Sequence, residues 1–444
     1  MNKSAVLLPF LCTAAWAQAP LSLKTAVHVA IDGNKLIQAS LAGQKAAQAR
    51  ITEARGGNLP KVNYSETWAR SNNPVFVFSS LLTQHQFGER NFQIGPLNRP
   101  DFLNNFQSLL TADQPLYDAG QTKYAVRSAE LTKNFTEETG RNTQMQVIAN
   151  VIRFYCDALL GAEQLIVNSQ AMRSAEADLK RAEAVRSVGM STDVDVLSIR
   201  VHIAAVREQQ IRIEAYLEVA NGSLNDAMGL PLDAAHTLTT ALTPLKSPGG
   251  LLSDYEKDSL ARPEARQAKL TTSLAANQVA TARSSLLPQV GVHAVFEADR
   301  QCFYERGGAN WLLSIGLRWN LFDGFSDKAR IQESTFALRK SEAEQQNAGS
   351  AIRLQVRQAF AESRAAQQRI DVARASVAEA EESLRITQNR YQNGMSNVTD
   401  LLRTETAVLE SRTRHLAAIH DQRVAAAMLE LAAGTLSADS EVLN

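Results

Sequence analysis

The residue types that most often carry chemistry are scattered through this sequence and are not gathered into a catalytic motif. His415 and His420 are five residues apart, so they do not share one helix face for metal binding as residues at i and i+4 would. The carboxylates are spread along helix-forming stretches with basic neighbours, which is typical of a solvated face. The sequence has no Walker loop and no HExxH, CxxC or GxSxG motif, so it indicates no enzyme, no cofactor and no metal site.

Two aspartates stand out because they occupy equivalent positions in a repeated segment. Asp195 and Asp400 each follow a Gly-Met-Ser triplet, at residues 189–191 and 394–396, and the two copies are about 205 residues apart. Gly supplies the left-handed turn that ends one helix, and Ser or Asn caps the next. Each copy is therefore predicted to be the tip of a helical hairpin. An acid in the first turn of a helix is favoured by the helix dipole, which offers a purely structural explanation for both aspartates.

Long helical patterns lead into both tips. They run from about 121 to 188 and from 326 to 393, and at about 1.5 Å per residue each would reach roughly 100 Å. Apolar and small residues recur there at alternating steps of four and three, which predicts a coiled-coil seam. In the second copy the seam contains Ile352, Val356, Ala359, Ser363, Ala366 and Ile370, and in the first Val147, Val151, Phe154, Ala158, Gly161 and Leu165. Partner helices are predicted from 192 to about 228 and from 397 to about 433.

Four shorter segments have the pattern of strands. They are predicted at 62–70 and 106–116 in the first copy, and at 289–297 and 310–320 in the second. In the last segment apolar and polar residues alternate, and Trp311 and Trp319 stand near its two ends. An apolar face bounded by aromatic residues is typical of a membrane barrel strand with an aromatic girdle. A soluble hairpin packed on a core is the alternative explanation.

Composition and targeting narrow the functional classes further. Lys and Arg together balance Asp and Glu at 46 each, so no basic surface indicates nucleic acid. Residues 1–17 have the features of a secretory signal, with Ala15-Trp16-Ala17 as the cleavage site, so the mature chain is expected to begin near Gln18. No later apolar run approaches the length of a membrane helix, and a crossing of the bilayer would therefore need strands.

The repeat predicts how the chain is divided. Leu59-Pro60 and Leu287-Pro288 mark the same helix-to-strand boundary in the two copies. The first copy is expected to span 18–230 and the second 262–434. Their hairpin tips are expected near 186–195 and 391–400.

Three further segments lie outside this regular pattern. Residues 71–105 are expected to form a long, partly folded surface loop, including Pro74–Phe78, which could be mistaken for a strand. Residues 231–261, with several Pro and Gly, are expected to form an irregular linker between the copies. The polar tail, 435–444, is expected to bury nothing.

Taken in order, these features resemble the TolC family of outer-membrane efflux proteins. The match rests on the signal segment, the two Leu-Pro pairs, the two tips, and the turns Leu116-Tyr117-Asp118 and Leu321-Phe322-Asp323, and it covers nearly the whole mature chain. It implies a mainly α fold with a membrane β-barrel, in which each subunit adds four strands to a trimeric twelve-stranded barrel and its helices form a long coiled-coil tunnel. Independently, four strands would leave open edges in lipid, so closure needs several copies.

The resemblance also implies roles for the tip residues. Contact with a periplasmic adaptor falls on Gly189, Met190 and Ser191 and on Gly394, Met395 and Ser396. A gate at the closed end falls on Asp400, Tyr391, Asp195 and Ser396. Three copies of Asp400 would face one another and attract cations, and Tyr391 could hydrogen-bond an acid of a neighbouring hairpin, with Asp195 as the candidate. Ser396 and Arg403 depart from the family pattern, which often has a basic residue and an acid there.

The predicted function is therefore a passive, gated duct in the bacterial outer membrane, with a long periplasmic extension, for efflux of drugs, metals or other small toxic compounds. The expected partners are two further copies of the chain, a periplasmic adaptor, an inner-membrane pump and outer-membrane lipid, with no nucleic acid. Two alternatives remain open at this point: the duct of a type I protein secretion system, and a periplasmic coiled-coil scaffold without a pore.

Overall fold

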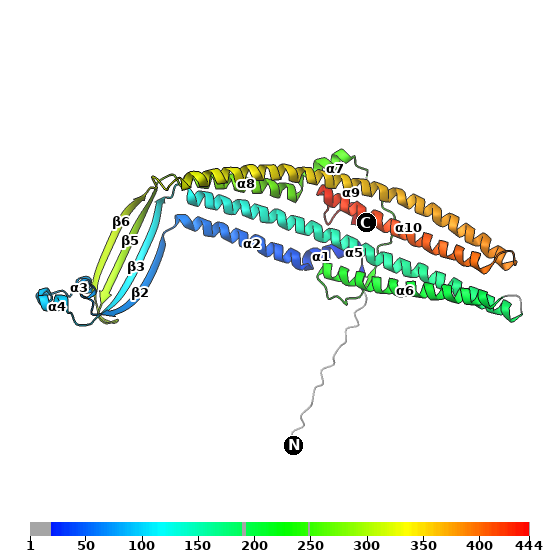
Figure 1. Cartoon of the computed structure of the whole chain (residues 1–444), viewed down its shortest axis with the longest axis horizontal. Helices are drawn as coiled ribbons and strands as arrows, with labels where there is room; N and C mark the ends of the chain where they lie inside the picture. The colour runs from blue at the N-terminus through cyan, green and yellow to red at the C-terminus, as the bar shows by residue number, and fades with distance from the viewer. Residues whose placement is uncertain (1–18, 189–191, 247–248, 444) are drawn as a thin grey trace, which may run out of the picture. The chain divides into compact units, whose positions relative to one another are not determined.

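The computed structural model describes residues 19–188, 192–246 and 249–443 (Figure 1). The predicted signal segment and the first predicted docking triplet, Gly189, Met190 and Ser191, lie outside the described residues. The chain divides into two compact units: a hairpin unit of residues 1–42, 138–266 and 347–444, and a sheet unit of residues 43–137 and 267–346. Among the described helices, none is both long and apolar enough to cross a membrane.

The helix bounds confirm the internal repeat. Helices α5 (Gln121–Ser187) and α9 (Ser326–Gln392) have 67 residues each. Helices α6 (Asp193–Met228) and α10 (Val398–Ala433) have 36 residues each. Every bound in the second copy falls 205 positions after its counterpart in the first. Figure 1 shows α5 with α6 as one antiparallel hairpin, and α9 with α10 as the other.

The predicted seam is confirmed where the hairpins lie in the hairpin unit. Val151 of α5 and Val356 and Ala366 of α9 are completely buried. The seam also contains a polar residue, Asn168, whose Nδ2 donates to the backbone oxygen of Val206 in α6 at 3.2 Å. Small seam residues let the helices approach closely, so packing and not intrinsic helix propensity holds these long helices together.

A hydrophobic core joins α5 and the C-terminal parts of α6 and α10 to the N-terminal segment of the chain. Strand β1 (Ala19–Leu21) pairs in parallel with β4 (His236–Leu238), and α1 (Leu23–Gly33) packs on this core. Tyr155 is fully buried there, and its hydroxyl donates to the Leu21 oxygen at 2.7 Å and accepts from the Thr240 amide at 3.2 Å. This phenol therefore ties α5 to β1 and to the segment that follows β4.

Residues 23–55 form two helices and not one. Helix α2 (Lys35–Arg55) begins directly after Asn34, which has extended backbone with ψ of 129°. The Asn34 side chain explains the break, because its Oδ1 accepts from the Leu36 amide while its Nδ2 donates to the Ala227 oxygen at 2.8 Å. Asn favours this kind of local capping over helix interior positions.

The linker between the copies is fastened to α10. It contains β4, α7 (Leu252–Asp258) and the 3-10 turn η3 (Ser259–Ala261). Gln422 exchanges two hydrogen bonds with the backbone of Leu245, at 3.0 and 2.9 Å, and Arg423 donates to the Thr243 oxygen at 2.8 Å. The linker is thus irregular, as expected, but it is held by buried side chains.

The expectation that the tail buries nothing is wrong. Leu436, Val442 and Leu443 are buried in the core of the hairpin unit, the last two in the 3-10 turn η4 (Glu441–Leu443). Gly434 is the reason, because its left-handed conformation (φ +79°) ends α10 and turns the chain back onto the core.

In the sheet unit the four predicted strands form one antiparallel sheet in the order β2-β3-β5-β6. Their bounds are Lys61–Ser71, Leu103–Tyr117, Gln289–Arg300 and Gly308–Arg318. The remaining elements of this unit include most of α8 (Pro263–Ser284), the 3-10 turn η1 (Gly56–Asn58), part of α2, and the beginnings of α5 and α9.

The two faces of the sheet differ in polarity. Residues paired across strands share a face, and one face carries the pairs Trp68–Phe106, Phe296–Trp311 and Val292–Ile315. The opposite face carries polar residues, among them Thr111, Asp113, His293 and Ser314. On the apolar face the Trp311 side chain is 79% exposed within the chain. Trp319 lies just beyond the end of β6, and its indole N–H donates to the Leu286 oxygen at 3.1 Å.

The segment predicted as a partly folded loop is more ordered than expected. It contains α3 (Pro74–Thr83), the 3-10 turn η2 (Glu89–Phe92) and α4 (Ile94–Asn98). Asn73 explains α3, because its Oδ1 accepts from the first amides of the helix and Pro74 occupies the first position. Gly308 allows the end of α3 to approach β6, since a Cβ there would lie 2.1 Å from the Thr83 oxygen.

The two turns that carried the resemblance have the same construction. Asp118 accepts from the Thr122 amide at 2.7 Å, and Asp323 accepts from the Asp327 amide at the same distance. Each Asp thereby caps the long helix that follows it, and two left-handed residues follow each Asp. The predicted repeat thus extends to individual hydrogen bonds.

Candidate functional site

The tip between α9 and α10 is a turn centred on Gly394. Its φ of +72° lies in the left-handed region that favours Gly. The Met395 amide donates to the Arg390 oxygen at 2.8 Å and the Gly394 amide to the Tyr391 oxygen at 3.0 Å, which satisfies carbonyls at the end of α9. A Cβ on Gly394 would meet no atom of the described residues within 4 Å, so among these residues backbone conformation and not space restricts this position.

Both helices that return from the tips begin with a side-chain cap. Thr192 and Asp195 form a capping box, in which the Asp195 carboxylate accepts from the Thr192 amide at 3.1 Å. Asn397 caps α10 by accepting from the Asp400 amide at 2.8 Å. Asp195 therefore has a structural role at the start of α6. The exposed Asp400 carboxylate accepts from the Ser396 hydroxyl at 3.2 Å, just as the Asp195 carboxylate accepts from the Thr192 hydroxyl at 3.0 Å.

Tyr391 lies half-buried where the two hairpins meet. It packs on a small apolar cluster that includes Ala182 and Val196 of the first hairpin. Burial raises the pKa of its hydroxyl, and the charges of Asp195 and Asp178 raise it further. Tyr391 and Asp195, which the resemblance paired, are thus close enough within one chain to interact electrostatically.

Two acids lie buried between the hairpins a few turns from the tips. Asp178 of α5 and Glu405 of α10 are 3% and 8% exposed. Ser174 donates to Glu405 at 3.1 Å, and Arg181 donates to Asp178 at 3.2 Å. Burial and then the adjoining Asp178 carboxyl raise the pKa of Glu405 to about 8. Glu405 is therefore largely protonated at neutral pH.

The sequence analysis missed this pair because it assigned the carboxylates to a solvated face. Heptad spacing could have found them. Asp178 comes three residues after the seam residue Ala175, and Glu405 comes three after Leu402 and four before Leu409. Both acids therefore occupy helix positions that continue the buried stripe.

A groove passes over Glu405 between the four helices of the hairpin unit. Its volume is ≈ 400 Å³. Its apolar walls are Val167, Ala171, Leu384, Val408 and Leu409. Its polar lining includes His202 of α6, whose Nε2 is 3.7 Å from the free oxygen of Glu405. Burial lowers the pKa of His202, so this imidazole is neutral at neutral pH.

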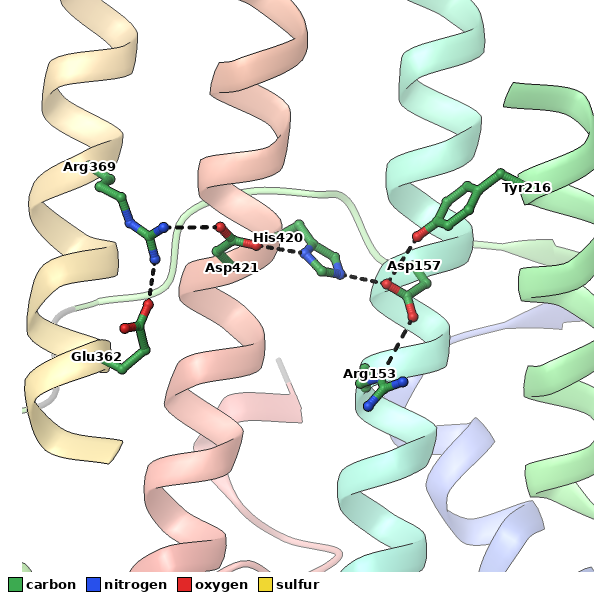
Figure 2. Close-up of polar contacts among 7 residues, drawn as sticks. All are labelled: Arg153, Asp157, Tyr216, Glu362, Arg369, His420 and Asp421. Atoms are coloured by element: carbon green, nitrogen blue, oxygen red, sulfur yellow. Dashed lines mark hydrogen bonds and ion pairs between the residues drawn. The ribbon is translucent and has the colours of Figure 1, made fainter. Parts of the chain in front are cut away.

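A second polar cluster crosses the hairpins farther from the tips (Figure 2). His420 of α10 is its centre, with Nε2 2.8 Å from Asp157 of α5 and Nδ1 3.2 Å from Asp421. Tyr216 of α6 donates to the same Asp157 carboxylate at 3.1 Å, and Arg153 lies 4.0 Å from it. Burial alone would raise the pKa of Asp157, but the His420 contacts outweigh it and the pKa is lowered.

The same cluster reaches α9 through Arg369. This guanidinium lies 3.4 Å from Asp421 and donates to Glu362 at 2.6 Å. Figure 2 shows that the cluster joins all four long helices. Of the partners of His420, Asp421 is the next residue on α10, but Asp157 comes from α5 and could not be foreseen from the sequence.

Among the residues that the structure describes, no three His, Cys, Asp or Glu side chains are arranged to hold a metal ion. Asp195 and Tyr391 come together at the tips, whereas Trp311 and Trp319 belong to the sheet unit and form no part of this site. The polar groups of this site are protonatable side chains and ion pairs that join the two hairpins.

Comparison with known proteins identifies relatives over almost the whole chain. The family model described as "Outer membrane efflux protein" matches residues 26–230 and 258–435. Protein CyaE of Bordetella pertussis is 26% identical over 76% of this chain and 72% of its own length. The pyoverdine export outer membrane protein OpmQ of Pseudomonas putida is 24% identical over 87% and 80%. The CmeC outer membrane channel of Campylobacter jejuni has a similar fold, with a TM-score of 0.80, 15% identity and coverage of 100% and 95%.

Proposed function

The chain belongs to the outer membrane efflux protein family, and from this we propose that it is the outer-membrane channel of a tripartite export system. It acts as a passive, gated duct that receives small molecules from the periplasm or from an inner-membrane pump. The name of the relative OpmQ, a pyoverdine export protein, supports a small-molecule cargo. The observation that carries the proposal is the duplicated fold itself, in which two long hairpins and two strand pairs repeat with the same spacing.

We infer that the working form is a homotrimer with a twelve-stranded barrel. The sheet has free edges on β2 and β6, and its apolar face is exposed within one chain. Unpaired backbone at an edge is prohibitive in lipid, so the strands of several copies must join. Three copies give an even number of strands within the range of known barrels. Trp311 and Trp319 then serve as an aromatic girdle against outer-membrane lipid.

The helices carry independent support for several copies. Helix α6 has a second apolar stripe besides its seam, spaced by three and four residues, and this stripe is exposed. It consists of Val194, Leu197, Val201, Ala204, Ile211 and Ala215, with Glu208 in the one intervening position. A helix face of this kind is suited to packing against another helix. In the trimer the stripe packs against a neighbouring subunit and helps to close the tunnel.

The tips then contact the rest of the export system. We propose that Gly394, Met395 and Ser396, with the equivalent triplet at 189–191, contact the periplasmic adaptor. The Met395 side chain is 63% exposed, as an adaptor contact requires. We further propose that Asp400, Tyr391, Asp195 and Ser396 form the gate, with Tyr391 and its apolar neighbours holding the two hairpins together while the duct is closed.

Native mass spectrometry of protein extracted in detergent from outer membranes tests the assembly. We expect three copies of a chain that begins near residue 18, because four strands per subunit cannot close a barrel alone. A stable monomer in the outer membrane would contradict both the barrel and the duct.

A further inference from the structure

The contact between α5 and α10 joins the first hairpin to the second within one chain. Its polar part has two centres, the Asp178–Glu405 pair near the tips and the His420 cluster farther away. Both centres contain more hydrogen-bond acceptors than donors unless a proton is added. The geometry of each shows where that proton belongs.

At the first centre two buried carboxyl oxygens have no hydrogen-bond donor within bonding distance among the residues that the structure describes. They are Oδ2 of Asp178 and Oε2 of Glu405. Their other oxygens are already occupied by Arg181 and Ser174. A carboxylate has no donor of its own, whereas a protonated carboxyl can donate to its neighbour. One proton between the two acids therefore satisfies both free oxygens and removes the repulsion of two buried charges.

The charged groups around this pair do not replace that proton. His202 of α6 is neutral, because burial lowers its pKa. From α9, Glu381 is held by Arg412 at 2.6 Å and Arg385 is held by Glu382 at 2.7 Å. These cations already have carboxylate partners at the rim of the groove, and Arg181 is paired with Asp178. The charge that is left without a cation is that of Glu405, and a proton neutralises it.

At the second centre His420 lies between two acceptors. Its Nε2 faces Asp157 and its Nδ1 faces Asp421, and only the doubly protonated imidazolium can donate to both. Burial by itself would lower the pKa of His420, but the hydrogen bonds to the two carboxylates outweigh it and raise the pKa. Arg153 and Tyr216 face Asp157 from α5 and α6, and α9 presents Arg369 and Glu362.

We propose that the α5–α10 contact is a pH-sensitive lock, held by one proton between Asp178 and Glu405 and by a second on His420, and that the hairpins separate as the pH rises. Each of the two protons stabilises the contact between the hairpins, and each is lost as the pH rises. Under the proposed function, on which this last step depends, separation of the hairpins loosens the gate, so the closed duct is most stable at acidic to neutral pH.

The pKa shifts determine how the stability of the α5–α10 contact depends on pH. Glu405 has a pKa raised from 4.5 to about 8, so its contribution is complete below pH 4.5 and is lost as the pH rises through about 8. His420 contributes fully below 6.5, and its contribution is lost as the pH rises through its raised pKa. Asp157 has a lowered pKa and stays ionised across this window.

Pulsed electron paramagnetic resonance on the assembled full-length chain measures the separation directly. Spin labels at Lys180→Cys and Arg403→Cys report on exposed positions of α5 and α10, with Cys302→Ser removing the accessible native thiol and Cys156 buried. Labelled chain is diluted with unlabelled chain, so that most assemblies carry one labelled copy. We expect the ratio of separated to packed hairpins to rise at least about tenfold from pH 6 to pH 9.

The isosteric variant Glu405→Gln provides the decisive comparison. Its amide can donate to Asp178 at every pH, so the increase in separation from pH 6 to pH 9 should be smaller than in the wild type, with only the His420 contribution left. Asp178→Asn should behave in the same way if Glu405→Gln fails to fold. His420→Gln should increase separation at pH 6. Glu410→Gln, an exposed acid on α10, should follow the wild type. Identical pH dependence in wild type and Glu405→Gln would overturn the lock, even where bilayer recordings show a working duct.

Discussion

Gly229→Ala is expected to reduce the yield of folded protein sharply and to lower its midpoint of thermal unfolding. Gly229 ends α6 with φ of +71°, a conformation that costs a residue with a Cβ about 1–2 kcal/mol. The added Cβ would also lie 2.4 Å from the Gly33 oxygen, which is backbone and cannot move aside without displacing α1. Overpacking of this kind costs typically about 1–3 kcal/mol more. Circular dichroism of the detergent-solubilised protein measures the midpoint.

Gly222→Ala is the matched control for this change. Gly222 lies one heptad earlier on the same helix, and a Cβ there would meet nothing within 4 Å. Ala is a better helix former than Gly by about 1 kcal/mol, so the control should be neutral or slightly stabilising. Equal behaviour of the two variants would show that the contact between Gly33 and Gly229 is not tight.

Gly394→Glu is expected to abolish export while leaving assembled protein in the membrane. Its backbone strain is about 1–2 kcal/mol, but a Cβ at this position has open space, so the hairpin should still form. The change alters the shape of the turn and adds a negative charge where the adaptor is proposed to dock. Transport by a reconstituted tripartite pump, with assembled protein quantified in parallel, measures both effects.

Gly349→Glu provides the control on the same helix. Gly349 lies in α9, far along the chain from the tip, and a Cβ there also meets nothing within 4 Å. It adds the same charge without disturbing a left-handed turn, so export should continue. Normal export by Gly394→Glu would remove this tip from the docking surface.

Local signals in the sequence predicted most of the fold. The Gly-Met-Ser triplets, the seam spacing and the alternation around Trp311 each report on structure within a few turns of chain. The internal repeat strengthened these predictions, because a signal that occurs in both copies indicates the same structure twice. Asp118 and Asp323, for example, accept equivalent hydrogen bonds in equivalent turns. Tertiary contacts explain the differences. Asn34 breaks a helical pattern by bonding to Ala227, about 190 positions away.

The candidate site was harder to foresee for the same reason. Asp195 and Tyr391 were recognisable from their places beside the tips. Glu405 and His420 acquire their properties from α5, more than 200 residues earlier in the chain, and sequence spacing does not show which buried acid meets which. Heptad position could have shown that Glu405 is buried, but not that Asp178 lies beside it.

Single-channel recording in a planar bilayer tests the central claim, that this chain forms a gated duct. Wild-type protein should give discrete conducting events of low basal conductance. Tyr391→Phe should raise that conductance, because the hydroxyl lies near Asp195 where the hairpins meet and its loss weakens the closed end. Correctly assembled protein that inserts but never conducts, in the wild type and in Tyr391→Phe alike, would contradict the account.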